Sequence, residues 1–235
     1  MQHMNYKFEL IEATILKRYK RFLSDIELEN GEIICAHVPN TGSMTACWAP
    51  GWKAYITQTD DPKRKLKYTL ELTHNGESFI CVNTGMTNKL VAEALENKVI
   101  TELAGYNEIK AEKKVLDSRL DFFLTEDGLA DAYVEVKNVT LKLDPDRALF
   151  PDAVTTRGQK HLKDLMLLKS QGHRAVMLYI INRTDVKTFE PASEIDPEYA
   201  KLLRLASQSG VEIMAYQSFI STSEILIKNK IEVLL

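Results

Sequence analysis

The sequence lacks the segments that would carry this chain into or across a membrane. The apolar run from Ala175 to Ile181 has seven residues, far short of the roughly 20 that a membrane helix needs. The first residues, Met1 to Tyr6, have neither a charged start nor an apolar secretory core. We therefore expect a cytoplasmic protein with no membrane partner. A second methionine at position 4 leaves open whether Met1 to His3 are native.

Cysteine is scarce, and positive charge is not in excess. The three cysteines, Cys35, Cys47 and Cys81, form neither a disulfide framework nor a paired zinc motif, so we expect reduced thiols. Thirty Lys and Arg residues stand against 33 Asp and Glu, which gives a net charge of −3. This balance excludes a positive field over the whole molecule, so any nucleic-acid binding must come from local patches.

The rest of the composition is globular, with 45% hydrophobic and 27% charged residues among 235. Residues 1–85 contain short apolar runs separated by turn signals such as Asn30-Gly31, which predicts a small β-barrel. Residues 86–235 alternate helical and strand patterns, which predicts an α/β (α+β) domain. The expected elements are a helix capped by Asn88, a strand at Lys114–Leu124, a second at Ala132–Leu143, a helix from Thr155 or Thr156 to about Gln171, a buried strand at Ala175–Ile181 and a helix at Pro197–Ser209.

One constellation in the second domain suggests metal chemistry. Glu135 and Lys137 are two residues apart in a predicted strand, so they share a face, and Asp121 lies on the strand before them. Two carboxylates that converge repel each other unless a cation joins them, and oxygen ligands suit Mg²⁺ or Mn²⁺. We predict Asp121 and Glu135 as metal ligands, with Lys137 as a catalytic neighbour and Glu93 or Glu96 as a further carboxylate. The alternative is a solvated cross-strand charge cluster.

A polar run at the start of a predicted helix adds further candidates. Arg157 and His161 are four residues apart and share a helix face, and Gln159 and Lys160 lie between them. Helix amino termini attract phosphate groups. We predict Gln159 and His161 as catalytic residues and Arg157 and Lys160 as nucleic-acid contacts, against the alternative of an ordinary polar first turn.

The barrel carries a basic and aromatic run, Lys17-Arg18-Tyr19-Lys20-Arg21-Phe22. In a strand, Lys17, Tyr19 and Arg21 would project together, so that cations follow a phosphate backbone while the ring stacks on bases. We predict Lys17, Arg18, Tyr19, Lys20 and Arg21 as nucleic-acid contacts. The Asn40-Thr41-Gly42-Ser43-Met44 run lacks the pattern of a nucleophile loop, and we interpret it as a structural turn.

The chain resembles two known groups of proteins. Asp121 followed by Glu135-x-Lys137 resembles the core of the PD-(D/E)XK nuclease superfamily, although Leu120 stands where the Pro-Asp pair has its proline. The chain as a whole is similar to the sugar fermentation stimulation protein family. The blocks that carry this similarity are Lys20-Arg21-Phe22-Leu23-Ser24-Asp25, Pro39 to Met44, Ser118-Arg119-Leu120-Asp121-Phe122, Val134 to Leu141 and Phe150 to His161.

The resemblance implies an OB-like barrel and a nuclease-like α/β domain, with DNA bound largely without sequence preference. The hypothesis that follows is a DNA-binding protein with a Mg²⁺-dependent phosphodiesterase site at Asp121, Glu135 and Lys137. The alternative is a non-catalytic DNA-binding factor in sugar (maltose) utilisation with a vestigial nuclease site. RNA is a further option, because a stacking platform accepts either nucleic acid.

Overall fold

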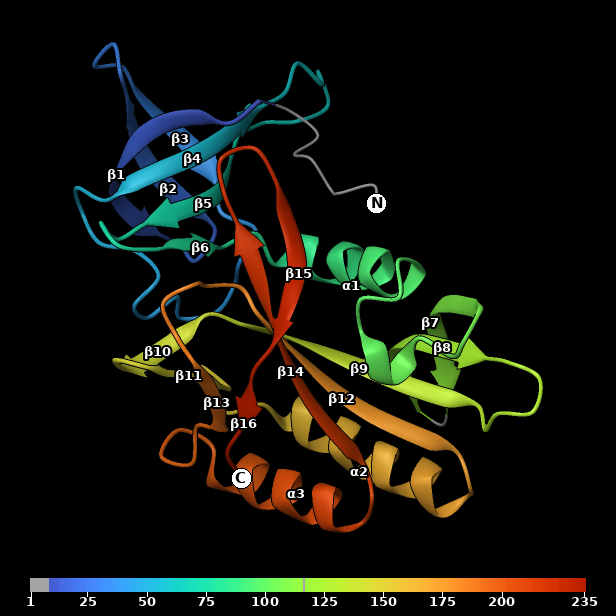
Figure 1. Cartoon of the computed structure of the whole chain (residues 1–235). Coiled ribbons are helices and arrows are strands. Elements are labelled where there is room, and N and C mark those ends of the chain that lie inside the picture. Colours follow the sequence, from blue (N-terminus) through green and yellow to red (C-terminus); the bar gives the residue numbers. More distant parts are fainter. Residues whose placement is uncertain (1–8, 116) are drawn as a thin grey trace.

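The computed structural model describes residues 9–115 and 117–235, which form two bodies packed side by side (Figure 1). Met1 to His3 lie outside these residues. The amino-terminal body is a sheet in the order β3-β2-β1-β4-β5-β6, and pairing of β3 with β5 closes its first five strands into a barrel. The strands are β1 (Ile11–Tyr19), β2 (Leu23–Leu28), β3 (Ile33–His37), β4 (Lys53–Gln58), β5 (Tyr68–His74) and β6 (Phe79–Cys81).

Alternating side chains fill the barrel. Ile15, Ile26, Ile56 and Leu70 are fully buried inside it, as the two-residue period of a strand requires. The predicted turn at Asn30-Gly31 joins β2 to β3, and Gly31 adopts a positive φ of 82° there, a conformation that glycine takes without steric cost. The predicted barrel is therefore confirmed.

The second body is built on a six-stranded sheet in the order β15-β14-β12-β9-β8-β7. Helix α1 covers one face, and α2 and α3 cover the other (Figure 1). The sheet strands are β7 (Glu108–Val115), β8 (Ser118–Thr125), β9 (Ala132–Val139), β12 (Arg174–Ile181), β14 (Glu212–Ile220) and β15 (Ile225–Lys230). The helices are α1 (Thr87–Glu96), α2 (Thr156–Ser170) and α3 (Pro197–Gln208), with the short 3₁₀ turns η1 (Thr84–Met86) and η2 (Thr101–Leu103).

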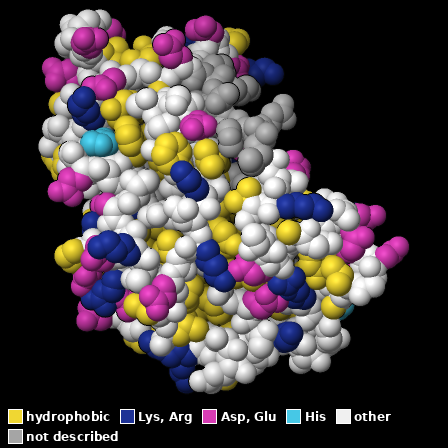
Figure 2. All heavy atoms as spheres, in the orientation of Figure 1, with side chains coloured by type: hydrophobic (Ala, Val, Ile, Leu, Met, Phe, Trp, Pro, Cys, Tyr) yellow, Lys and Arg dark blue, Asp and Glu magenta, His cyan; other side chains and the backbone are white. Residues whose placement is uncertain are grey.

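A smaller sheet, in the order β10-β11-β13-β16, stands beside this core. Its strands are β10 (Leu141–Asp144), β11 (Arg147–Phe150), β13 (Thr188–Pro191) and β16 (Glu232–Val233). No helix in the described ranges is long and apolar enough to cross a membrane. Figure 2 shows Lys and Arg side chains interspersed with Asp and Glu over one face of the molecule, without a continuous field of either sign.

Most predicted elements of the second domain are present, with three corrections. The strand predicted at Ala132–Leu143 is two strands, because β9 ends at Val139 and β10, which begins at Leu141, belongs to the smaller sheet. The single strand predicted at Lys114–Leu124 is wrong, because the chain reverses between Val115 and Ser118, which pair with each other across the β7–β8 hairpin. The predicted cap of α1 is also wrong, because Met86 occupies the N-cap position and Asn88 lies inside the first turn. The cap of α2 is confirmed, since the Thr155 side chain accepts a hydrogen bond from the Gly158 amide.

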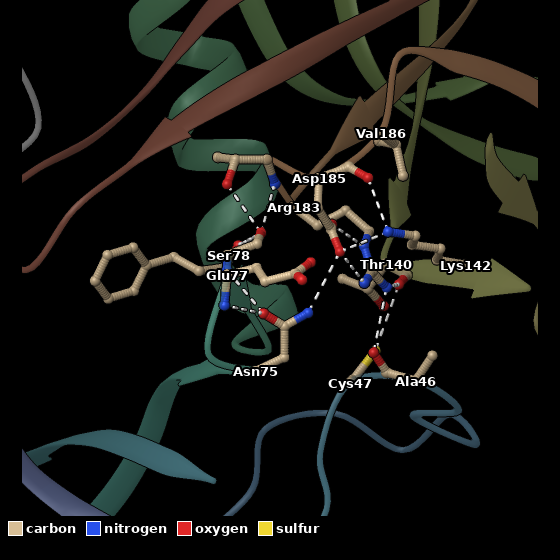
Figure 3. A network of polar contacts seen from close by, with 12 residues as sticks. Ala46, Cys47, Asn75, Glu77, Ser78, Thr140, Lys142, Arg183, Asp185 and Val186 are labelled. Carbon is tan, nitrogen blue, oxygen red and sulfur yellow. Dashed lines mark hydrogen bonds and ion pairs between the residues drawn. The ribbon is translucent and has the colours of Figure 1, made fainter. Parts of the chain in front are cut away.

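The two bodies share a joint with an apolar and a polar part. Tyr55, Leu72 and Cys81 of the barrel pack into the same buried cluster as Leu90 and Val91 of α1. Beside this cluster, a polar network runs from the barrel loops to the segment after β12 (Figure 3). The domain division at residues 85 and 86 stays a prediction.

Candidate functional site

The site begins on β9, a central strand of the main sheet. Val134 and Val136 face the α1 side and join its core, whereas Glu135 and Lys137 face α2. Glu135 is buried, with 3% of its surface exposed, and its Oε1 atom accepts a hydrogen bond from the Lys137 ammonium group. The strand period therefore places these two side chains together, as the sequence predicts.

Asp121 lies where β8 separates from β9. The β8–β9 ladder covers only Phe122 to Leu124, so Asp121 is the first residue beyond the last pair. Its Oδ2 accepts a hydrogen bond from the Val136 amide at 2.8 Å, and its Oδ1 accepts one from Asn88 Nδ2 at 2.7 Å. Asn88 was not among the predicted site residues. Its only signal was its place at the start of a helix.

Helix α2 supplies the other side of the site. His161 is buried, and its Nδ1 forms a hydrogen bond with Glu135 Oε1. Arg157, four residues earlier, donates from Nε to His161 Nε2 at 3.4 Å. Because a guanidinium can only donate, Nε2 is the acceptor and Nδ1 carries the proton that goes to Glu135. Both bonds to Glu135 thus fall on Oε1, and Oε2 is buried with no hydrogen-bond partner among the described residues.

The two carboxylates differ in their electrostatic surroundings. Burial raises the pKa of Asp121, and the negative charge of Glu135 raises it further. Burial acts on Glu135 in the same direction, but the hydrogen bond from His161 and the positive charge of Lys137 outweigh it and lower the pKa of Glu135. A cation between the two acids would relieve the repulsion that raises the pKa of Asp121.

The donor set fits Mg²⁺ or a similar hard cation. Mg²⁺ in proteins is commonly bound by one or two carboxylates, with water and substrate phosphate completing its shell. Asp121 and Glu135 supply two carboxylates, and Glu135 Oε2 is a buried oxygen without a partner in the described part of the chain. Within those same residues, no three His, Cys, Asp or Glu side chains form a complete metal cage. The site therefore suits a weakly held, partly hydrated ion.

Three predicted site residues have other partners. Gln159 Nε2 donates to both carboxylate oxygens of Asp196, at 2.9 and 3.1 Å, and so joins α2 to the cap of α3. Lys160 donates to the Asp117 carbonyl and to Ser118 Oγ beside the β7–β8 turn. Glu93 lines a groove between α1 and β15, near Lys228. In the sheet, β15 and β8 are separated by three strands.

The basic run in the barrel is also only partly available. Strand β1 ends at Tyr19, so Arg21 does not continue the face of Lys17 and Tyr19 as predicted. The Tyr19 hydroxyl donates to Asp25 Oδ1 at 2.8 Å, and Arg18 donates to backbone carbonyls of the loop at residues 40–43. The exposed cations of the run are Lys17, Lys20 and Arg21.

Fold and site together define a two-domain protein in which an OB-type barrel is joined to a mixed α/β domain. Two family models match the chain in this order: the SfsA N-terminal OB domain at residues 16–82 and the sugar fermentation stimulation protein RE domain at residues 85–224. The chain belongs to the sugar fermentation stimulation protein family.

Relatives support this membership along the full length. The sugar fermentation stimulation protein homolog of Geotalea uraniireducens is 49% identical over 98% of this chain and 99% of its own length. The homolog from Geotalea daltonii is 48% identical over 96% and 97% of the two chains. The structure of Pyrococcus furiosus SfsA in complex with Ca²⁺ covers 100% of both chains with a TM-score of 0.89 at 29% identity.

Proposed function

We propose that this protein binds DNA and that Asp121 and Glu135 hold a divalent cation for phosphodiester cleavage. The observation that carries the proposal is Glu135 Oε2, a buried carboxylate oxygen without a partner among the described residues, beside a second carboxylate. The Ca²⁺ complex of the Pyrococcus furiosus relative supports a divalent ion in this family. When bound, such an ion supplies Lewis-acid activation of a phosphate oxygen and of water.

The residues around the two acids have separable roles in this proposal. His161 and Lys137 both hold Glu135 Oε1, which leaves Oε2 without a partner among the described residues and keeps the carboxylate ionised. Lys137 also brings a positive charge to the place where a phosphate would lie. Arg157 is exposed and uses Nε on His161, which leaves its terminal nitrogens to bind a neighbouring phosphate.

Incubation of the full-length protein with DNA and Mg²⁺ or Mn²⁺ tests this proposal. We expect cleavage of at least one of single-stranded, duplex and branched substrates, and about 100-fold slower cleavage by Lys137→Ala, the usual cost of losing one charge-stabilising donor. Lys110→Ala is a matched control, because Lys110 lies on the edge strand β7 and its ion pair is with the exposed Glu108. If the wild type and Lys137→Ala were equally inert on all three substrates, the proposed phosphodiester cleavage would be refuted.

A second candidate function is DNA binding without cleavage. It is favoured by the absence of a complete three-residue metal cage in residues 9–115 and 117–235. This candidate predicts that Asp121→Asn binds DNA as the wild type does. It also predicts that neutralising Lys17, Lys20 and Arg21 weakens binding and its dependence on salt. Arg18 is left out of that variant, because its guanidinium holds backbone carbonyls of the barrel.

A further inference from the structure

The loop between β1 and β2 presents an aromatic ring beside two cations. Tyr19 pairs with Leu23, so the loop consists of Lys20, Arg21 and Phe22. Phe22 is 46% exposed, and neither an aromatic nor a cationic neighbour covers its ring within the described part of the chain. Lys20 and Arg21 are exposed and form no ion pair with any described residue. A single exposed ring next to two cations without an ion-pair partner among the described residues differs from the broad apolar patch of a protein interface.

The backbone of this loop is held in place although its side chains are free. Lys20 and Arg21 have positive φ angles of 48° and 65°, which non-glycine residues adopt only where the surroundings impose them. The Arg18 guanidinium imposes them here, because it donates to the Arg21 carbonyl and to the carbonyls of Asn40 and Gly42. The Phe22 carbonyl also accepts a hydrogen bond from the Val38 amide at 2.8 Å. The ring is therefore presented on a fixed platform.

The loop at residues 40–43, to which Arg18 donates hydrogen bonds, also contacts the domain that carries the candidate site. The Ser43 amide donates to Asp152 Oδ2 at 2.9 Å, and a Cβ on Gly42 would lie only 2.3 Å from that oxygen. Asp152 stands three residues before Thr155, which caps the helix that bears Arg157 and His161. The loop and the site therefore keep a fixed relation to each other.

We infer that Phe22 stacks on an unpaired base while Lys20 and Arg21 contact the adjoining phosphates, so that the DNA is single-stranded where it meets this loop. The inference rests on the proposed DNA binding and adds the form of the substrate. A base inside a duplex is already stacked on both sides, whereas a base in a single strand can place one face on a ring. Because the backbone that carries Phe22 is already held, it loses little conformational freedom on binding.

Binding of the full-length protein to three labelled probes tests this inference. The probes are an oligothymidine strand, the same strand with abasic residues, and a duplex of equal length. We expect Phe22→Leu to bind the oligothymidine about tenfold more weakly and the abasic strand as the wild type does. Phe219→Leu is the matched control, because Phe219 is also exposed, at 38%, beside a lysine but lies on β14. Equal affinity of wild type and Phe22→Leu for oligothymidine would overturn the inference.

A second variant separates phosphate contacts from folding. Asn and Gly accept positive φ angles more readily than Lys and Arg, so Lys20→Asn/Arg21→Gly should melt no lower than the wild type. Its affinity for all three probes should fall, with a salt slope on single strands reduced by about 1.4 for two lost phosphate contacts. Unchanged affinity would overturn the role of the cations. A wild type that binds none of the probes would instead refute the proposed DNA binding itself.

Discussion

Asp185 and Glu135 are two largely buried carboxylates with cationic neighbours, and they differ in how many of their oxygens accept hydrogen bonds. Asp185 lies at the joint between the two bodies (Figure 3). Its Oδ1 accepts from Arg183 Nε at 2.7 Å, and its Oδ2 accepts from Arg183 Nη2 and Lys142 Nζ, each at 2.9 Å. Arg183 also donates to the Thr140 carbonyl at 2.6 Å and to the Ala46 carbonyl at 3.3 Å. Both oxygens of Asp185 are thus used within the fold.

Glu135 is more deeply buried than Asp185, with 3% of its side chain exposed against 10%, but it uses only one oxygen. His161 and Lys137 both bond to Oε1, and Oε2 has no partner among the described residues. A buried oxygen without a hydrogen-bond partner costs free energy that a hydrogen-bonded oxygen does not. Asp185 therefore has an architectural role, whereas Glu135 meets the requirement of the cation site proposed above.

The largest expected effect comes from substituting Asp185, both of whose oxygens accept hydrogen bonds from Arg183 or Lys142. Asp185→Asn leaves the charges of Arg183 and Lys142 without their carboxylate in a buried setting, so we expect unfolding free energy to fall by about 3 kcal/mol or more. Urea denaturation measures the change. Asp146→Asn is the control, because its ion pair with Lys187 is exposed on both sides, and its cost should stay below about 0.5 kcal/mol. Similar losses in the two variants would contradict the architectural role of Asp185.

Glu135, whose Oε2 has no partner among the described residues, should respond to a divalent ion instead. We expect Mg²⁺, Mn²⁺ or Ca²⁺ to stabilise the wild type by about 2.7 kcal/mol at 100 times the dissociation constant, since only the folded state holds both acids together. Glu135→Gln should abolish this gain, because a neutral amide is a poor ligand for a hard cation. Asp185→Asn should keep it despite its lower stability. Thermal melting across a metal titration decides, and an equal gain in Glu135→Gln would place the ion elsewhere.

The sequence predicts those parts of the site that depend on a local period. Glu135 and Lys137 share a face because a strand repeats every two residues, and Arg157 reaches His161 because a helix brings residues four apart together. The barrel, both later helices and the buried strand follow from the same kind of pattern. These features need no knowledge of which segments meet in space.

Features that depend on contacts between distant segments escape such patterns. Arg18 belongs to a basic run that suggests nucleic acid, yet its partners are carbonyls more than 20 residues away at Asn40 and Gly42. Gln159 likewise turns to Asp196 rather than to the site. Distant partners of Arg183 and Asp185 come from positions 46, 75, 140 and 142, so no local sequence pattern predicts the joint.

A third carboxylate, Glu102, has both oxygens hydrogen-bonded but is less buried than Asp185. Its substitution has the smallest expected effect. Glu102 on η2 accepts from Tyr216 at 2.6 Å and pairs with Lys230, so both oxygens are used, but its side chain is 24% exposed. Burial would raise the pKa of Glu102, yet Lys230 and Tyr216 together lower it to about 2.

Because the folded-state pKa of Glu102 lies below the unfolded value of roughly 4.3, its contribution is present above that pH and is lost as pH falls toward 2. After allowance for solvent screening, we expect Glu102→Gln to cost about 1 kcal/mol at pH 7 and progressively less below pH 4. Unfolding free energies measured at pH 7, 4 and 3 check this, with Glu29→Gln as a control that should show no such change, because Glu29 is exposed. If Glu102→Gln lowered the unfolding free energy as much as Asp185→Asn does, then the number of hydrogen-bonded oxygens, and not burial, would set the contribution of these carboxylates to stability.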